Sequence, residues 1–217
     1  MTFDPFGDFE TRGYLRNHFE LRDRRQLAQV EFNNYRTVLP EALAYLEGSD
    51  LSYEDVLQVH RILFEAIYPW AGDDRSVTAP NIAVTRGGYD DLFCHPVECR
   101  RVGEYALRDA GRPEIYLVAP GDAYSHLCHS HPFLDGNGRT LLLVHSEMLR
   151  RASAHIVWEN VSPDDFLRTL TEDLRSPNQG VLDNFLLPYL VRTPRSRDDL
   201  QATLVDQILI HGIHTQG

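Results

Sequence analysis

One ten-residue stretch gathers the residue types that phosphate chemistry requires. It runs from His131 to Thr140 and reads HPFLDGNGRT. A histidine side chain has an ordinary pKa of about 6.5, so His131 can accept a proton near neutral pH. Asp135 can hold a magnesium ion, which proteins usually bind through one or two carboxylates together with substrate phosphates. The stretch therefore predicts a base and a metal ligand within one loop.

The second half of this stretch has the features of an anion site. Two glycines allow main-chain N–H groups to approach a ligand closely. If a helix begins at Asn137 or Gly138, its first N–H groups and its positive end face the same point. The arginine adds a permanent charge and a planar fork that fits phosphate oxygens. A tight turn that merely caps a buried helix would not need the histidine, the carboxylate and the arginine together. The residues expected to bind phosphate are Gly136, Asn137, Gly138 and Arg139.

This stretch resembles the signature of the Fic family, whose general pattern is HPFx(D/E)GNGR, and every fixed position matches. Residues 67–75, IYPWAGDDR, are similar to the YPWAG-x-x-R segment that leads into the family's flap. Residues 13–17, GYLRN, resemble the opening of the bacterial toxin-type members. The three motifs occur in the expected order, and the resemblance covers most of the chain.

The resemblance implies transfer of AMP from ATP to a hydroxyl group of a target protein. His131 would take the proton from a Ser, Thr or Tyr side chain as that side chain attacks the α-phosphorus. Asp135 would hold Mg²⁺, and the GNGR residues would stabilise the charge of the transition state. Phe133 would be buried and would anchor the loop against the core.

A short β-hairpin is expected between residues 71 and 93. Val77, Ile82 and Val84 are residue types that favour strands, and a Gly-Gly pair follows them. In Fic proteins this region is the flap, which holds a segment of the target by strand addition. The resemblance places target docking at Ile82, Ala83, Val84 and Thr85.

One position departs from many adenylylating members of the family. Those members have a second arginine three residues after the first, which contacts the distal phosphates, whereas this chain has Leu142 there. Three readings stay open. The donor is ATP; or it is another diphosphate such as a different nucleotide, a nucleotide-sugar or CDP-choline; or the chain is an inactive module that only binds a peptide.

The resemblance also concerns regulation and partners. Many Fic proteins are inhibited by a glutamate in an (S/T)xxxE(G/N) helix. Glu47 and Glu159 do not complete this pattern, because neither has Ser or Thr at the required position. The toxin-like N-terminus suggests a separately encoded small antitoxin, or none. Topoisomerase subunits are candidate targets, because some toxin-type relatives act on them.

Composition favours a single unit away from membranes and nucleic acids. The chain has 217 residues, enough to bury a sizeable core. Its 21 basic and 32 acidic residues give a net charge of −11, which argues against a general nucleic-acid binder and an anionic membrane partner. No apolar run reaches the roughly 20 residues of a membrane span, and no leader is recognisable. Three cysteines without a CxxC pattern argue against a disulfide framework, so the cytoplasm is the expected location, with a secreted effector left open.

Hydrophobic periodicity predicts an all-α fold, a helical bundle with one short β-hairpin. The resemblance implies that this bundle is a Fic fold and that the hairpin is its flap. Pro40 should break or kink the first helix, and the helix after Arg139 is apolar enough to run through the centre. We expect residues 1–192 to form a Fic domain with a core at about 52–175, and residues 193–217 to form a linker and a last helix. Helices are expected at residues 24–47, 53–68, 95–109, 120–129, 137–148, 163–174, 181–191 and 200–210.

The histidines allow a rival interpretation. His126, His129, His131 and His145 could form a zinc cluster with the neighbouring Cys128. The spacing matches no common structural zinc site, and the cysteine points away from the helix face that the first two histidines share. Packing or surface positions are therefore favoured for the histidines other than the loop residue.

Overall fold

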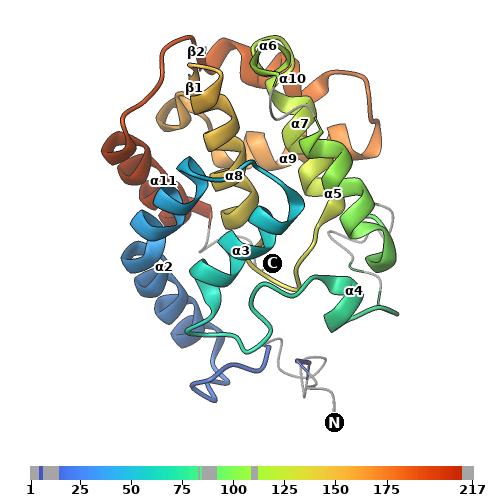
Figure 1. Cartoon of the computed structure of the whole chain (residues 1–217), viewed down its shortest axis with the longest axis vertical. Coiled ribbons are helices and arrows are strands. Elements are labelled where there is room, and N and C mark those ends of the chain that lie inside the picture. The colour runs from blue at the N-terminus through green and yellow to red at the C-terminus, as the bar shows by residue number, and fades with distance from the viewer. Residues whose placement is uncertain (1–4, 7–14, 83, 85–91, 109–111, 212–217) are drawn as a thin grey trace.

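The computed structural model describes residues 5–6, 15–82, 84, 92–108 and 112–211, with side chains up to residue 206 (Figure 1). The α-helices among them are α2 (Arg24–Glu47), α3 (Tyr53–Phe64), α4 (Arg75–Thr78), α5 (Cys99–Leu107), α6 (Pro113–Tyr116), α7 (Pro120–Ser130), α8 (Asn137–Arg151), α9 (Pro163–Arg175), α10 (Val181–Leu186) and α11 (Arg197–His211). Short 3-10 turns occur at η1 (Pro96–Glu98), η2 (Trp158–Asn160) and η3 (Leu187–Tyr189). Within the described ranges, none of the helices has the length and apolar character needed to cross a membrane.

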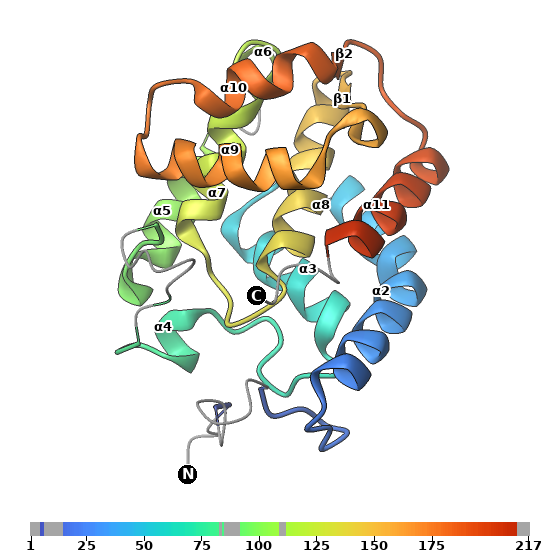
Figure 2. The ribbon, with the colours of Figure 1, turned by 180° about the vertical axis from the view of Figure 1, so that it is seen from behind.

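Helix α8 lies in the middle of the molecule. Figure 1 shows α2 and α11 on one side of it and α5 and α7 on the other, and Figure 2, which views the molecule from behind, shows α9 and α10 on the side toward the viewer. Every residue from Thr140 to Leu149 is buried, so this helix has no solvent face over most of its length. A helix that is apolar around most of its circumference can be stable only inside a core. The prediction that this segment runs through the centre is confirmed.

The first two long helices begin as the sequence predicts. Asp23 caps α2 by accepting a hydrogen bond from the backbone N–H of Gln26. Ser52 and Asp55 form a capping box at the start of α3, which begins where the sequence predicts a helix; each residue accepts a backbone N–H of the other. Helix α2 does not break at Pro40, which lies inside it.

A two-stranded antiparallel sheet is the only sheet in the described part of the chain. It pairs β1 (His155–Ile156) with β2 (Leu190–Val191). The hairpin expected between residues 71 and 93 is not formed at Val77, which lies in the helical turn α4. Asp74 caps that turn by accepting the backbone N–H of Ser76 at 3.0 Å. The strand prediction for this residue is wrong, whereas residues 83 and 85–91 lie outside the described ranges. The all-α fold class is confirmed.

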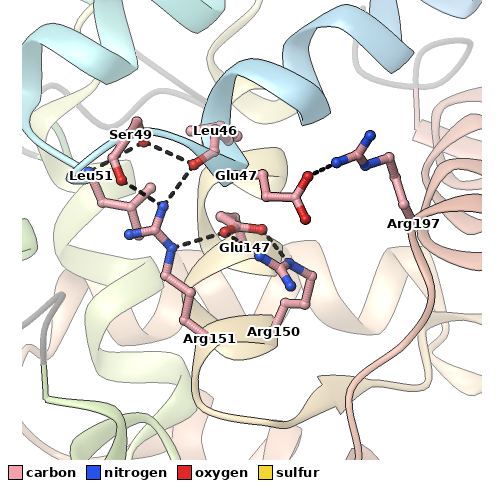
Figure 3. Close-up of polar contacts among 8 residues, drawn as sticks. All are labelled: Leu46, Glu47, Ser49, Leu51, Glu147, Arg150, Arg151 and Arg197. Atoms are coloured by element: carbon pink, nitrogen blue, oxygen red, sulfur yellow. Dashed lines mark hydrogen bonds and ion pairs between the residues drawn. The ribbon is translucent and has the colours of Figure 1, made fainter.

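Helix α11 packs against α2, α8 and η2. Its Leu200 and Leu204 are buried in the same core as the central helix. Arg197 at its first position forms an ion pair with Glu47 at the end of α2 (Figure 3). The last described helix therefore contributes to the main core.

A buried carboxylate joins the ends of α2 and α8. Glu147 is 2% exposed and accepts hydrogen bonds from Arg150 and Arg151 (Figure 3). Arg151 also donates from Nη2 to the carbonyl oxygens of Leu46 at 2.6 Å and Ser49 at 2.8 Å. These carbonyls lie at the C-terminal end of α2, where a helix leaves acceptors without partners. One guanidinium therefore satisfies both a buried charge and a helix end.

We expect Arg151→Ala to lower the free energy of unfolding by about 2–3 kcal/mol, because the buried glutamate and two carbonyls lose a charged donor. Arg168→Ala is the matched control, since its ion pair with Asp165 lies on the surface with 76% and 46% exposure. That control should change stability by less than about 1 kcal/mol. Urea unfolding of the three proteins measures both values, and equal losses in the two variants would contradict the assignment.

Candidate active site

The loop from His131 to Gly136 begins with a left-handed backbone turn. His131 follows α7 directly and has φ 39° and ψ 60°. A residue other than glycine adopts this region uncommonly, at a cost on the order of 1 kcal/mol. The half-buried imidazole stacks on Phe93, with ring centroids 3.8 Å apart and planes at 24°. The turn ends α7, and the stacked ring holds the imidazole at the start of the loop.

Arg75 supports the backbone of this turn from α4. Its backbone N–H donates to the carbonyl of Pro132 at 2.7 Å, and its Nε donates to the carbonyl of His131 at 2.6 Å. Its Nη2 donates to the carbonyl of Cys94 at 2.9 Å, and the side chain is fully buried. The sequence singled out this arginine only as the last residue of a motif. The structure gives it a physical role, which is to fasten the α4 segment to the loop.

Asn137 closes the loop through both atoms of its amide. The backbone N–H of Phe133 donates to its Oδ1 at 2.9 Å, and its Nδ2 donates to the carbonyl of the same residue at 2.7 Å. The amide is 6% exposed, and the Phe133 ring is fully buried, as predicted. The Asn137 side chain therefore fixes the loop. Its backbone N–H is the first of α8 and has no acceptor within the helix.

Gly136 is the residue that allows α8 to start where it does. It has φ 77°, and a Cβ there would lie 2.5 Å from the ring of Phe64 and 3.1 Å from Nε2 of His60. Both the backbone conformation and the close packing exclude a larger residue. Helix α8 begins at Asn137, which confirms the helix start that the sequence predicts.

The first turn of α8 presents main-chain donors to an open surface. The N–H groups of its first residues have no acceptor within the helix, and the turn contains no acidic residue. Gly138 is exposed, and no described atom lies within 4 Å of the place where its Cβ would be. The positive end of a long helix is thus accessible, which is a suitable site for an anion.

Arg139 is directed to a buried glutamate of α2. Its Nη1 lies 2.8 Å from Oε2 of Glu31, and its Nη2 lies 3.5 Å from Oδ1 of Asp135. The guanidinium also lies over the ring of Phe64 at 4.6 Å, and Tyr68 donates its hydroxyl to the glutamate. An anion at the helix end would therefore share this arginine with a carboxylate that is already bound to it.

The pKa values of this pair follow from burial and charge. Burial raises the pKa of Glu31, and the charge of Arg139 offsets only part of that effect. Burial alone would lower the pKa of Arg139, but the charges of Glu31 and Asp135 outweigh it and raise that pKa. The arginine is therefore permanently charged, and the glutamate is its nearest counter-charge.

His60 connects α3 to the loop and to the preceding motif. Its Nδ1 accepts the backbone N–H of Gly72 at 2.9 Å, and its Nε2 faces the carbonyl of Asp135 at 3.1 Å. These partners fix the neutral ring with the proton on Nε2. The ring stacks on Phe133 at 3.7 Å and is fully buried, so burial lowers its pKa to about 3.

We expect the protein to lose stability as the pH falls from about 7 to 4 because of two buried neutral histidines. Burial lowers the pKa of His60 to about 3 and that of His145 to about 4, whereas both take up protons near pH 6.5 when unfolded. The unfolded state then binds more protons, so each histidine costs up to about 1.4 kcal/mol per pH unit in this window.

Urea unfolding at several pH values measures this dependence. His145 makes its hydrogen bond through Nε2, which donates to the carbonyl of Pro120 at 2.7 Å, and His145→Gln keeps a donor there. That variant should show a shallower loss of stability below pH 6.5 than the parent protein. His18→Gln is the control, because the side chain of His18 is exposed. Identical pH profiles for the parent and His145→Gln would contradict the expectation.

The remaining predicted residues have the following places. The Asp135 carboxylate is 39% exposed and accepts the backbone N–H of Gly136 at 2.5 Å. Of the expected flap, Ile82 is 45% exposed and Val84 packs against the core, whereas Ala83 and Thr85 lie outside the described residues. Leu142 is buried within α8.

The histidines near the loop have ordinary partners. His126 contacts the carbonyl and the carboxylate of Asp122, and His129 contacts the carbonyl of Leu92. Over the described ranges, no group of three or more His, Cys, Asp or Glu side chains is arranged to hold a metal ion.

Three proteins illustrate what the chain is similar to. It is 25% identical over 220 residues to protein adenylyltransferase VbhT of Bartonella schoenbuchensis, covering 96% of this chain but 44% of that protein. It is 27% identical over 173 residues to probable protein adenylyltransferase y4lH of Sinorhizobium fredii, covering 70% of this chain and 79% of the relative. The N-terminal Fic domain of a Bartonella quintana effector, solved with bound ADP, aligns with a TM-score of 0.70 at 18% identity, over 85% of this chain and 94% of that one.

The family assignment follows from the sequence and the fold together. Residues 50–149 match the model of the Fic/DOC family, and this range contains α3, the Arg75 segment, the loop and nearly all of α8. The solved Fic domain has the same fold. The chain therefore contains a Fic/DOC domain over residues 50–149, within a fold that solved Fic domains share.

Proposed function

We propose that this chain is a protein adenylyltransferase of the toxin or effector type, which transfers AMP from ATP to a hydroxyl side chain of a target protein. The observation that carries the proposal is the open N-terminal turn of α8, which begins six residues after His131 in the same fixed loop. In the proposed reaction, a phosphate bound at this helix end is attacked by the hydroxyl group whose proton His131 accepts. The relatives named adenylyltransferase support the same reaction.

The chemical step assigns one task to each part of the site. His131 takes the proton from the attacking hydroxyl group, whose oxygen forms a bond to the α-phosphorus. The bond from that phosphorus to the bridging oxygen breaks, and pyrophosphate leaves. The backbone N–H groups of Asn137, Gly138 and Arg139 stabilise the charge on the transferred phosphoryl group. Gly136 allows these donors to come close.

Asp135 is the residue that would hold Mg²⁺. Its half-exposed carboxylate keeps oxygen atoms available beside the helix end, although one of them also receives the N–H of Gly136. A single carboxylate is enough, because Mg²⁺ takes its other ligands from phosphates and water. When bound, the ion supplies charge neutralisation for the leaving phosphates.

Leu142 favours a second candidate, which is transfer from a different diphosphate donor. The family's second arginine would stand here, and the leucine offers no cation to a distal phosphate. Another nucleotide, a nucleotide-sugar or CDP-choline would then replace ATP. The flap residues Ile82, Ala83, Val84 and Thr85 would hold the target in either case, and an inactive peptide-binding module would keep only this function.

The test uses purified protein, Mg²⁺ and a cell lysate with ATP labelled at either the α- or the γ-phosphate. Label on protein from the α-position alone supports AMP transfer, and label from the γ-position overturns it in favour of a kinase-like reaction. If ATP gives no label, intact-mass analysis with the other donors distinguishes the second candidate from a binding module. Purified topoisomerase subunits, with and without a co-expressed small antitoxin, test the proposed partners.

A further inference from the structure

Two cysteines lie together directly beside the loop. The sulfur of Cys94 is 3.9 Å from the sulfur of Cys99, and both are reduced. Cys94 precedes η1 and is partly exposed, whereas Cys99 begins α5 and is fully buried. The single thiol hydrogen of Cys94 has two acceptors within reach, the sulfur of Cys99 and the carbonyl of Ser130 at 3.3 Å. Cys94 is therefore the more exposed residue of the pair.

Arg75 supplies the electrostatic setting of this pair. Its guanidinium is fully buried, and within the described residues its Nη1 has no hydrogen-bond partner and no carboxylate forms an ion pair with it. A buried cation without a counter-charge is costly. The hydrogen bond from Cys94, with the nearby Arg75 charge, lowers the pKa of the Cys99 thiol, and the same hydrogen bond raises the pKa of Cys94. A thiolate at Cys99 would supply the missing charge.

We infer that Cys94 and Cys99 form a redox-active dithiol, which a hydroperoxide oxidises to a reversible disulfide. A thiolate attacks the peroxide oxygen and forms a sulfenic acid, while the alcohol or water leaves. The second thiol then displaces water from the sulfenic sulfur. In total, two thiols and one hydroperoxide give one disulfide, one alcohol and one water.

The geometry requires only a short movement. The sulfurs must approach from 3.9 Å to about 2.05 Å, which rotation of the partly exposed Cys94 side chain can supply. The two residues are five positions apart, across the 3-10 turn Pro96–Glu98. Cys128, the third cysteine, is buried in α7 and serves as an internal comparison.

Oxidation would act on the loop through Cys94, a consequence that rests on the proposed function. The backbone N–H of Cys94 donates to the carbonyl of His129 at 2.9 Å, and its carbonyl accepts from Arg75. The disulfide removes the Cys94 thiol hydrogen that can reach the carbonyl of Ser130, the residue before His131, and it prevents a thiolate at Cys99. A displacement of about 1 Å at a catalytic group can lower a rate by about 100-fold.

The experiment treats the full chain with hydrogen peroxide, blocks remaining thiols with N-ethylmaleimide and maps the peptides by mass spectrometry. We expect a peptide spanning residues 94–99 that has lost two hydrogen atoms and is restored by dithiothreitol. Cys94→Ser and Cys99→Ser should each abolish it, whereas Cys128→Ser should leave it unchanged. A disulfide to Cys128, an intermolecular disulfide, or over-oxidised Cys94 without the internal disulfide would overturn the inference.

The transfer assay is run on the same samples as a separate measurement. We expect peroxide to reduce transfer by about tenfold or more in the parent and in Cys128→Ser, and to have a smaller effect on Cys99→Ser. A disulfide that forms without changing transfer would refute its link to the loop but not the dithiol itself. Because the peptide map needs no activity, absence of AMP transfer would leave the dithiol test intact.

Discussion

Replacing His131 by alanine is expected to lower transfer by about 10²–10⁴-fold, because the variant lacks the group that takes the proton from the attacking hydroxyl. The fold should remain. The imidazole is only half-buried, and the backbone contacts that hold the turn come from Arg75 and involve carbonyl oxygens that alanine retains. Transfer is measured as label on the target at saturating ATP, and the fold is checked by urea unfolding.

His126→Ala is the matched control for this experiment. It removes a histidine of α7, the helix that precedes the loop, whose side chain contacts Asp122 and the ring of Tyr105. We expect this control to keep transfer within about twofold of the parent, because its side chain, 24% exposed, contacts residues of α7 and α5 rather than of the loop. Full transfer by His131→Ala, or an equal loss in both variants, would refute a proton-accepting role.

Replacing Glu31 by alanine is expected to lower the free energy of unfolding by about 3–5 kcal/mol, because it leaves the buried charge of Arg139 without its closest partner. The glutamate is 8% exposed and also receives the hydroxyl of Tyr68, which would lose its acceptor. Glu54→Ala is the control, because the ion pair of Glu54 with Arg100 lies on the surface with 66% and 47% exposure. It should cost less than about 1 kcal/mol.

A double-mutant cycle separates the charge pair from loss of packing. If the glutamate and the arginine act as a pair, Glu31→Ala combined with Arg139→Leu should destabilise by at least about 1 kcal/mol less than the sum of the two single variants. Additive losses would show that the ion pair is not what the glutamate contributes. The same variants, assayed for ATP binding, report whether Arg139 must be held by α2 to serve the loop.

The parts of the site that the sequence predicts are local. Gly136 has a positive φ and directly precedes α8, and the residue types that predict this turn and this helix start lie within a few positions of it. The position of α8 in the core also follows from its own apolar residues. The type and order of residues in the loop therefore carry most of the information needed to expect an anion site with an adjacent base.

The supports of the loop could not be predicted, because they come from far along the chain. Glu31 is 108 positions from Arg139, His60 is 75 from Asp135 and Arg75 is 56 from His131. The hydrophobic periodicity of α2 contained one sign of these long-range contacts. A charged residue at Glu31 falls between Leu27 and Tyr35 on the buried face of α2, where a charge needs a partner, but the pattern does not identify which one.

The strand expected at Val77 shows that the preference of a single residue can give a wrong prediction. Its β-branched side chain favours a strand, yet the aspartate before it caps a helical turn and Arg75 is drawn toward the loop. Tertiary contacts and a local cap outweigh the intrinsic preference of one residue. In contrast, the Ser52 capping box predicts its helix correctly, because the interaction is complete within four residues.

The packing of α11 against α2 bears on the order of events during synthesis. Helix α2 leaves the ribosome first among the described helices, but Leu200 and Leu204, which belong to the same core, leave it last. Contacts between distant parts of a chain form slowly, because a large loop must close first. The nascent chain therefore carries an uncovered apolar face on α2 until α11 has been translated, and chaperones have access to that face during this interval.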